Sequence, residues 1–74
     1  MYTVITANGC TFCQKAKATL STTGIAFQEF NLSKDKWVTT LVKQAGHKTV
    51  PQIFDSDGAY VGGYVELIDY LSLT

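Results

Sequence analysis

The sequence predicts one α/β domain whose elements follow in the order β-α-β-α-β-β-α. Short runs rich in β-branched and aromatic residues alternate with segments whose apolar residues recur at helical spacing. A strand–helix–strand start favours a parallel, right-handed pair of strands, and a later short turn favours an antiparallel hairpin in the same sheet. The chain has 74 residues and is 46% apolar, so we expect residues 1–74 to form a single domain with one small core.

The first half of the chain predicts two strands around a helix. Residues 2–6 are a short β-rich run, and residues 25–32 roughly alternate apolar and polar side chains. Between them, residues 11–23 carry apolar side chains at intervals of four, at Phe12, Ala16 and Leu20. Gly24 is a plausible residue to end this helix.

The second half predicts a second helix, a hairpin and a third helix. Ser33 is a good N-cap, Gly46 a good stop, and one apolar stripe lies between them at Val38, Leu41, Val42 and Ala45. Residues 50–54 and 59–61 read as strands joined by a turn at residues 55–58. The last helix face is marked by Tyr64, Leu67, Ile68 and Leu71.

Charge and composition exclude several classes of function. All six basic residues are Lys, and six acidic residues balance them, which argues against binding to nucleic acid. No apolar run is long enough to span a membrane, and we expect no signal peptide because the start of the chain lacks a basic region. One pair of cysteines is too few for a secreted disulfide framework, so we expect a reducing cytoplasmic location.

The two cysteines, Cys10 and Cys13, lie two residues apart where a strand passes into a helix. Unpaired N–H groups and the helix dipole favour a negative charge there, and the thiolate is the reactive form of cysteine. A zinc half-site is the main alternative, but His47 is the only other soft ligand in the chain. The spacing beside a βαβ pattern therefore favours a reversible redox pair over zinc or incidental cysteines.

The two thiols should differ in reactivity. Cys10 lies at the helix boundary, so we expect it to be more exposed and its thiol pKa to be lowered. Cys13 lies within the first turn, so we expect it to be buried and protonated until it is needed. Two other segments stand out: Thr49-Val50-Pro51 at the start of the third strand, where the sequence leaves cis and trans open, and Gly62-Gly63 before the last helix.

Together these segments resemble the glutaredoxin family, in particular its short bacterial and bacteriophage members. The resemblance rests on Cys10-Thr11-Phe12-Cys13, on residues 49–54 (TVPQIF) and on Val61-Gly62-Gly63-Tyr64, in that order and spacing. It implies a thioredoxin-like fold with a four-stranded mixed sheet and three helices. It also implies a cis peptide bond at Pro51.

The resemblance further implies a glutathione-dependent thiol–disulfide oxidoreductase in which Cys10 attacks and Cys13 resolves. Glutathione would be a co-substrate and no metal or permanent cofactor would be bound. Protein disulfides, with ribonucleotide reductase as one client, would be reduced by a monomer. The implied glutathione site consists of Phe12, Thr49, Val50, Pro51, Gly63, Tyr64, Val65 and Glu66.

Three residues depart from the family pattern, and two alternative functions stay open. Thr11 replaces the usual proline, Ala7 replaces a frequent Lys or Arg, and Val65 replaces a frequent Thr. Thr11 keeps open a dimer that binds a [2Fe–2S] cluster through Cys10 and glutathione. A glutaredoxin-like thioredoxin, reduced by thioredoxin reductase, is the other alternative.

Overall fold

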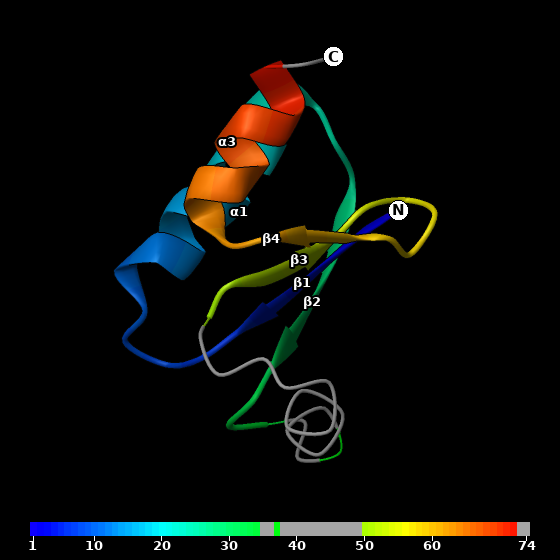
Figure 1. Cartoon of the computed structure of the whole chain (residues 1–74). Helices are drawn as coiled ribbons and strands as arrows, with labels where there is room; N and C mark the ends of the chain where they lie inside the picture. Colours follow the sequence, from blue (N-terminus) through cyan, green and yellow to red (C-terminus); the bar gives the residue numbers. More distant parts are fainter. Residues whose placement is uncertain (35–36, 38–49, 73–74) are drawn as a thin grey trace.

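The computed structural model describes residues 1–34, 37 and 50–72, and Figure 1 shows a sheet with helices packed on it. The four strands lie in the order β2-β1-β3-β4. Their bounds are β1 Tyr2–Thr6, β2 Phe27–Asn31, β3 Gln52–Phe54 and β4 Tyr60–Gly62. The α/β class and the mixed sheet predicted from the sequence are therefore confirmed.

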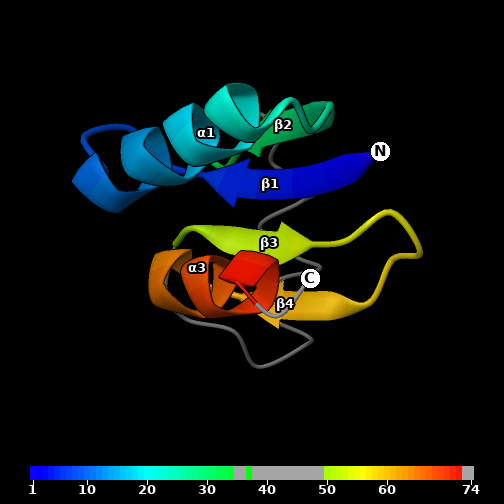
Figure 2. The ribbon, with the colours of Figure 1, turned by 90° about the horizontal axis from the view of Figure 1, so that it is seen from above.

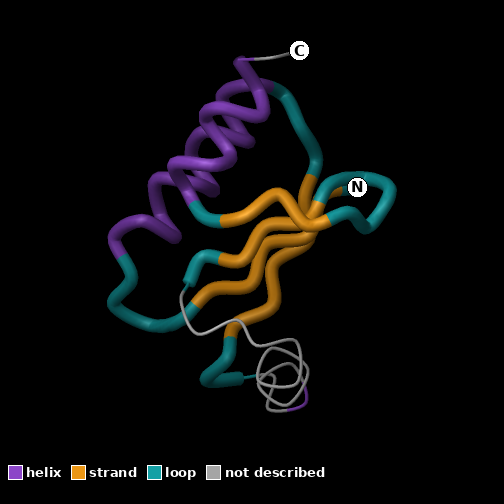
Figure 3. The backbone as a smooth tube through the Cα atoms, in the orientation of Figure 1, coloured by secondary structure: helices purple, strands orange, loops and turns teal. Residues whose placement is uncertain are grey.

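Strand directions follow the prediction. β1 and β2 are parallel, with Tyr2 opposite Phe27 and Thr6 opposite Asn31. β3 is antiparallel to both β1 and β4, and a register irregularity lies between Ile53 and Phe54. Figure 3 shows these strands side by side as one sheet. The sheet is mixed because a helical crossover links β1 to β2, whereas a tight turn links β3 to β4.

Both described helices cover one face of the sheet. Figures 1 and 2 show α1, Thr11–Thr23, over β1 and β2, and α3, Tyr64–Ser72, over β3 and β4. The fully buried core between helices and sheet consists of Val4, Ala16, Leu20, Ile53 and Leu67. Each described helix and the two central strands thus contribute to one core.

The opposite face of the sheet carries a second apolar cluster. Ile5 packs there with Phe30, Leu32 and Phe54. The Trp37 and Phe30 rings form a T-shaped pair, with the ring centres 5.4 Å apart. The helix expected between Ser33 and Gly46 falls, apart from residues 33, 34 and 37, outside the described residues.

Local signals explain where α1 and the hairpin turn begin and end. Gly24 adopts φ 79°, and the Ile25 N–H donates to the Leu20 carbonyl over 2.9 Å, as expected of a left-handed glycine stop. In the turn, Asp55 Oδ1 accepts from the Asp57 and Ala59 N–H groups, each over 2.9 Å. Within the described residues, no helix is both long and apolar enough to cross a membrane.

Candidate functional site

Topology brings three distant segments to one edge of the sheet. β1 and β4 end at this edge, and antiparallel β3 begins there (Figure 1). Cys10 follows β1, Pro51 precedes β3 and Gly63 follows β4. Both described helices also start at this edge, so their N-terminal dipoles point toward the same region.

Cys10 is the N-cap of α1. Its backbone is extended, with φ −94° and ψ 105°, and its Sγ accepts the Cys13 N–H over 3.0 Å. This side chain takes the position of the serine or aspartate that usually caps a helix. A negative sulfur at this position would be stabilised by the same N–H group and by the helix dipole.

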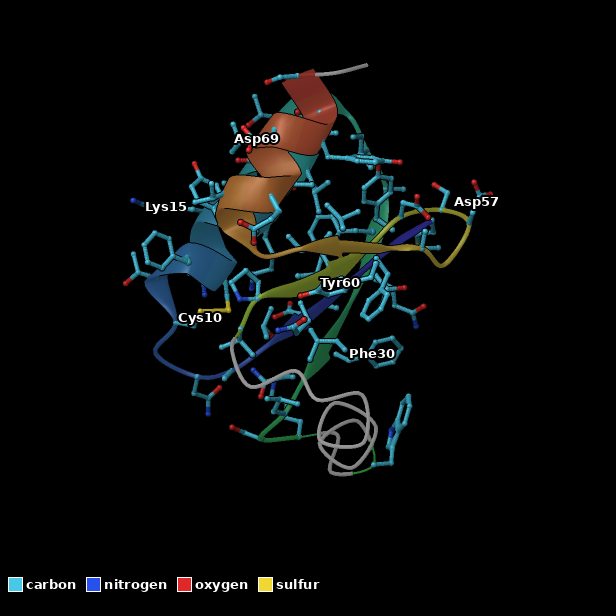
Figure 4. The ribbon with its side chains drawn as sticks, in the orientation of Figure 1. Cys10, Lys15, Phe30, Asp57, Tyr60 and Asp69 are labelled. Carbon is cyan, nitrogen blue, oxygen red and sulfur yellow. A yellow bond between two sulfur atoms is a disulfide. The ribbon has the colours of Figure 1, made fainter. Side chains whose placement is uncertain are left out.

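The two sulfurs form a disulfide, which Figure 4 shows beside the Cys10 label. Cys13 is only 1% exposed, whereas Cys10 is partly exposed. The expected difference in exposure between the cysteines is therefore present. An incoming thiolate or disulfide can reach Cys10 from solvent but cannot reach Cys13 without movement of the helix.

The segment before β3 lies directly against the disulfide. The Cys10 Sγ is 3.9 Å from the Val50 carbonyl oxygen, and the Val50–Pro51 peptide bond is cis. A disulfide sulfur carries no proton, so this approach is a contact and not a hydrogen bond. Thr49, the neighbouring residue in the predicted site, lies outside the described residues.

Two aromatic rings connect the starts of α1 and α3. Phe12, 54% exposed, stacks on Tyr64 with ring centres 6.0 Å apart and an interplanar angle of 30°. The Lys15 Nζ lies 5.3 Å from the centre of the Phe12 ring, on the α1 side. This cation–π contact was not anticipated from the sequence, although a spacing of three residues on a helix is compatible with it.

Gly62, Gly63 and Glu66 form the start of α3. The Glu66 Oε1 accepts the Gly63 N–H over 2.8 Å, which is the backward half of a capping box. Gly62 has φ 126°, and a Cβ built on it would lie 2.6 Å from the Glu66 Cβ. The missing side chains of the glycine pair therefore permit the Glu66 side chain to fold back over the start of α3. The sequence predicts such a close approach to the backbone at a glycine pair.

Glu66 thus has a local partner that the sequence reasoning missed. Its carboxylate is hydrogen-bonded to the Gly63 N–H, and the residue also lines a groove beside the disulfide, where we expect it to contact glutathione. The signal was present in the sequence, because a glutamate three residues after the N-cap is the spacing of a capping box.

A groove of about 140 Å³ joins these pieces. It is lined by Phe12, Val50, Pro51, Gly63, Tyr64, Val65 and Glu66. These are seven of the eight residues expected around glutathione, the eighth being Thr49. Because Val50 also touches the Cys10 sulfur, the groove begins beside the disulfide and extends to the start of α3. Its rim includes Val65, which is 61% exposed.

Comparison with known proteins assigns the family. The family model described as Glutaredoxin matches residues 1–61. This chain belongs to the glutaredoxin family. It is 38% identical over 68 residues to glutaredoxin 3 of Escherichia coli, covering 86% of this chain and 77% of that protein. Glutaredoxins are thiol–disulfide oxidoreductases that act through cysteine. Cys10 and Cys13 are the two cysteines of this chain, so they form its redox pair, and they lie beside the groove.

Two further comparisons concern architecture. This glutaredoxin is 36% identical over 69 residues to the hybrid peroxiredoxin hyPrx5 of Haemophilus influenzae, covering 93% of this chain but only 28% of that longer protein. The structure of the glutaredoxin-like protein NrdH-redoxin from Escherichia coli superposes with a TM-score of 0.82 at 21% identity, covering 95% of this chain and 92% of that one. The second match confirms the thioredoxin-like fold.

Proposed function

We propose that this glutaredoxin uses glutathione to reduce protein disulfides and glutathione mixed disulfides. The observation that carries the proposal is the partly exposed Cys10, disulfide-bonded to buried Cys13 beside the groove. We also propose a cytoplasmic monomer, with ribonucleotide reductase among its protein clients, as the family resemblance implies.

Glutathione mixed disulfides need only Cys10. Its thiolate attacks the glutathione sulfur, the substrate S–S bond breaks, and the released substrate thiolate takes a proton from solvent. Glutathione is then bonded to Cys10. A second glutathione thiolate attacks that glutathione sulfur, which releases Cys10 as a thiolate and oxidised glutathione as product. The complete cycle consumes one glutathione thiol, because the glutathione sulfur of the mixed disulfide is already oxidised and leaves as the other half of oxidised glutathione.

Protein disulfides need both cysteines. Cys10 attacks one client sulfur, forms an intermolecular disulfide and releases the other client sulfur as a thiol. The Cys13 thiol then loses its proton and attacks Cys10, so the client leaves with both sulfurs reduced. That step would form a Cys10–Cys13 disulfide, the pairing present in this structure, and two glutathione thiols would return it to the dithiol.

The groove suggests how glutathione lies. Its cysteine backbone would run beside the Val50 backbone, in the manner of a short added strand. Its γ-glutamyl end would reach α3, whose first helical hydrogen bond runs from the Leu67 N–H to the Gly63 carbonyl over 2.9 Å. The N–H groups of Tyr64 and Val65 precede that bond and could meet a carboxylate.

The position of Glu66 motivates a second candidate reductant. Its carboxylate already accepts the Gly63 N–H, which places negative charge where the γ-glutamyl carboxylate would arrive. A flavoprotein thioredoxin reductase would not need that subsite. Reduction of the Cys10–Cys13 disulfide by glutathione and by thioredoxin reductase, measured in parallel at equal protein concentration, decides between the two reductants.

The division of labour between the cysteines is the sharpest test of the mechanism. Cys13→Ser should keep reduction of a glutathione mixed disulfide within a few-fold of wild type and lose turnover with a protein disulfide, because only the second reaction needs a resolving thiol. Cys10→Ser should lose both. Glutathione-coupled assays with both substrates measure this, and retained activity in Cys10→Ser would show that the roles are assigned wrongly.

A further inference from the structure

The outward side of α3 continues the groove beyond the residues expected to bind glutathione. Val65 lines the groove, and Ile68 lies one helical turn further along the same side. They are 61% and 37% exposed, respectively. Glu66 and Asp69 flank them and are also exposed. We call Val65, Glu66, Ile68 and Asp69 the α3 face.

Charge is divided across the groove. Residues 50–74 contain four acidic residues, two of which are in the α3 face, and contain neither Lys nor Arg. On the other side, Lys15 of α1 lies against the Phe12 ring. Figure 4 shows Asp69 on α3 and Lys15 on α1, while Asp57 lies at the distant hairpin turn. A ligand that extends from Cys10 along α3 therefore meets apolar side chains bordered by carboxylates.

We propose that the α3 face docks the segment of a client protein that adjoins its reactive disulfide, and that it selects segments carrying a basic side chain two residues from an apolar one. This inference rests on the proposed function, because it concerns the protein substrates of the same Cys10. The apolar side chain would cover Val65 and Ile68, and the basic one would lie near Asp69. Val65 and Asp69 are separated by about 6 Å along the helix, which two residues of an extended client segment can span.

The carboxylates of the α3 face should act mainly on the rate at which a charged client segment associates with the protein. Exposed charges a few ångströms apart interact by about 1 kcal/mol in water, which corresponds to roughly fivefold in rate or affinity. The carboxylates attract a basic client segment and repel an acidic one, and both effects increase the ratio of the two clients' reduction rates. Such a preference should weaken as salt is added, because exposed charges are screened.

Matched disulfide peptides test the proposal. Two peptides with the same cysteine loop and the same flanking leucine carry either Lys or Glu two residues from that leucine, so that both side chains can face α3. We expect wild-type protein to reduce the Lys peptide with a kcat/KM about three- to tenfold higher than the Glu peptide at low salt. Asp69→Asn should shrink that ratio at least twofold, and 0.5 M NaCl should shrink it in the wild type.

Asp57→Asn removes the same charge far from the groove and should leave the ratio unchanged. A ratio near one in wild type, or an equal effect of the Asp57 and Asp69 substitutions, would overturn the docking proposal. Reduction of a small neutral disulfide, bis(2-hydroxyethyl) disulfide, tests the proposed function separately. If wild type reduces it and shows no peptide preference, only the docking proposal fails; if wild type reduces neither it nor the peptides, the proposed function fails and the docking proposal with it.

Discussion

Gly62 illustrates how one missing side chain shapes the candidate site. Its φ of 126° lies in a region that L-residues rarely adopt, and an added Cβ would lie 2.6 Å from the Glu66 Cβ and 2.7 Å from its Cγ. Glu66 could not then approach the Gly63 N–H, and the first turn of α3 would lose its cap. Gly62 is not among the residues that line the groove, but it allows Glu66 and Gly63, which do line it, to take their positions.

Gly62→Ala should therefore destabilise the protein more than Gly58→Ala does. Gly58 also has a positive φ, 83°, but an added Cβ there meets nothing within 4 Å. Backbone strain alone should cost about 1–2 kcal/mol at Gly58, and displacement of Glu66 should add roughly 1–3 kcal/mol at Gly62. Urea unfolding of both variants measures the difference, and equal losses would contradict the steric explanation.

At the scale of elements, one carboxylate ties α1 to two strands. Glu29 of β2 accepts from the Thr6 hydroxyl of β1 over 2.6 Å and pairs with the Lys17 Nζ of α1 over 3.1 Å. The Thr6 hydrogen bond is the main cause that lowers the pKa of Glu29 from its ordinary 4.5, and Lys17 lowers it further while burial opposes both. The contact fixes the helix whose first turn carries the cysteines.

The lowered pKa of Glu29 gives a pH dependence of defined sign. A carboxylate whose pKa is lower in the folded state stabilises the fold fully above 4.5, and that contribution is lost as pH falls through the folded value. Wild type should therefore lose more unfolding free energy between pH 6 and pH 3 than Glu29→Gln does. Urea titrations at both pH values test this, and parallel losses in the two proteins would refute the assignment.

Element boundaries show what local sequence signals can and cannot supply. The predicted bounds of β1 and α1 agree with the observed ones, because a β-rich run and a glycine stop are local signals. The second strand was predicted from residue 25, yet β2 begins at Phe27, because the Ile25 N–H is used to close α1. The third was predicted from residue 50, yet β3 begins at Gln52, after Pro51, which has no N–H to donate.

For the whole molecule, both helices and the sheet share a small core. Leu20 of α1, Ile53 of β3 and Leu67 of α3 are each fully buried in it. A chain of 74 residues has a net stability of only about 4–11 kcal/mol at typical values per residue. Loss of one large core side chain should consequently affect the site, because α1 and α3 carry its two ends.

Leu20→Ala should lower the unfolding free energy by about 2–5 kcal/mol, as expected when a fully buried leucine leaves a cavity. Ala18→Gly is a suitable control, because Ala18 is an exposed position in the same helix and the change should cost about 1 kcal/mol. Urea unfolding measures both, and a loss below 1 kcal/mol for Leu20→Ala would show that α1 is not anchored in the core.

The candidate site was predictable where it depends on motifs and unpredictable where it depends on contacts across the fold. The cysteine spacing, Pro51 and the glycine pair identified the three segments that topology then brings to one edge. That Lys15 would lie over Phe12 depends on a side-chain conformation that no pattern specifies, whereas the capping-box spacing of Glu66 is a signal for its hydrogen bond with the Gly63 N–H.

The central claim is that the Cys10 thiolate is a nucleophile stabilised at the start of a helix, while the Cys13 thiol stays buried and protonated until it resolves a mixed disulfide. Alkylation of the fully reduced protein with iodoacetamide, followed by mass spectrometry as a function of pH, tests it most directly. We predict that Cys10 is modified first and that Cys13 stays unmodified. The Cys10 alkylation rate should reach half its maximum at a pH well below about 8.5, which is the pKa of an ordinary cysteine thiol. Initial modification of Cys13, or a Cys10 profile like that of a free cysteine, would contradict the account.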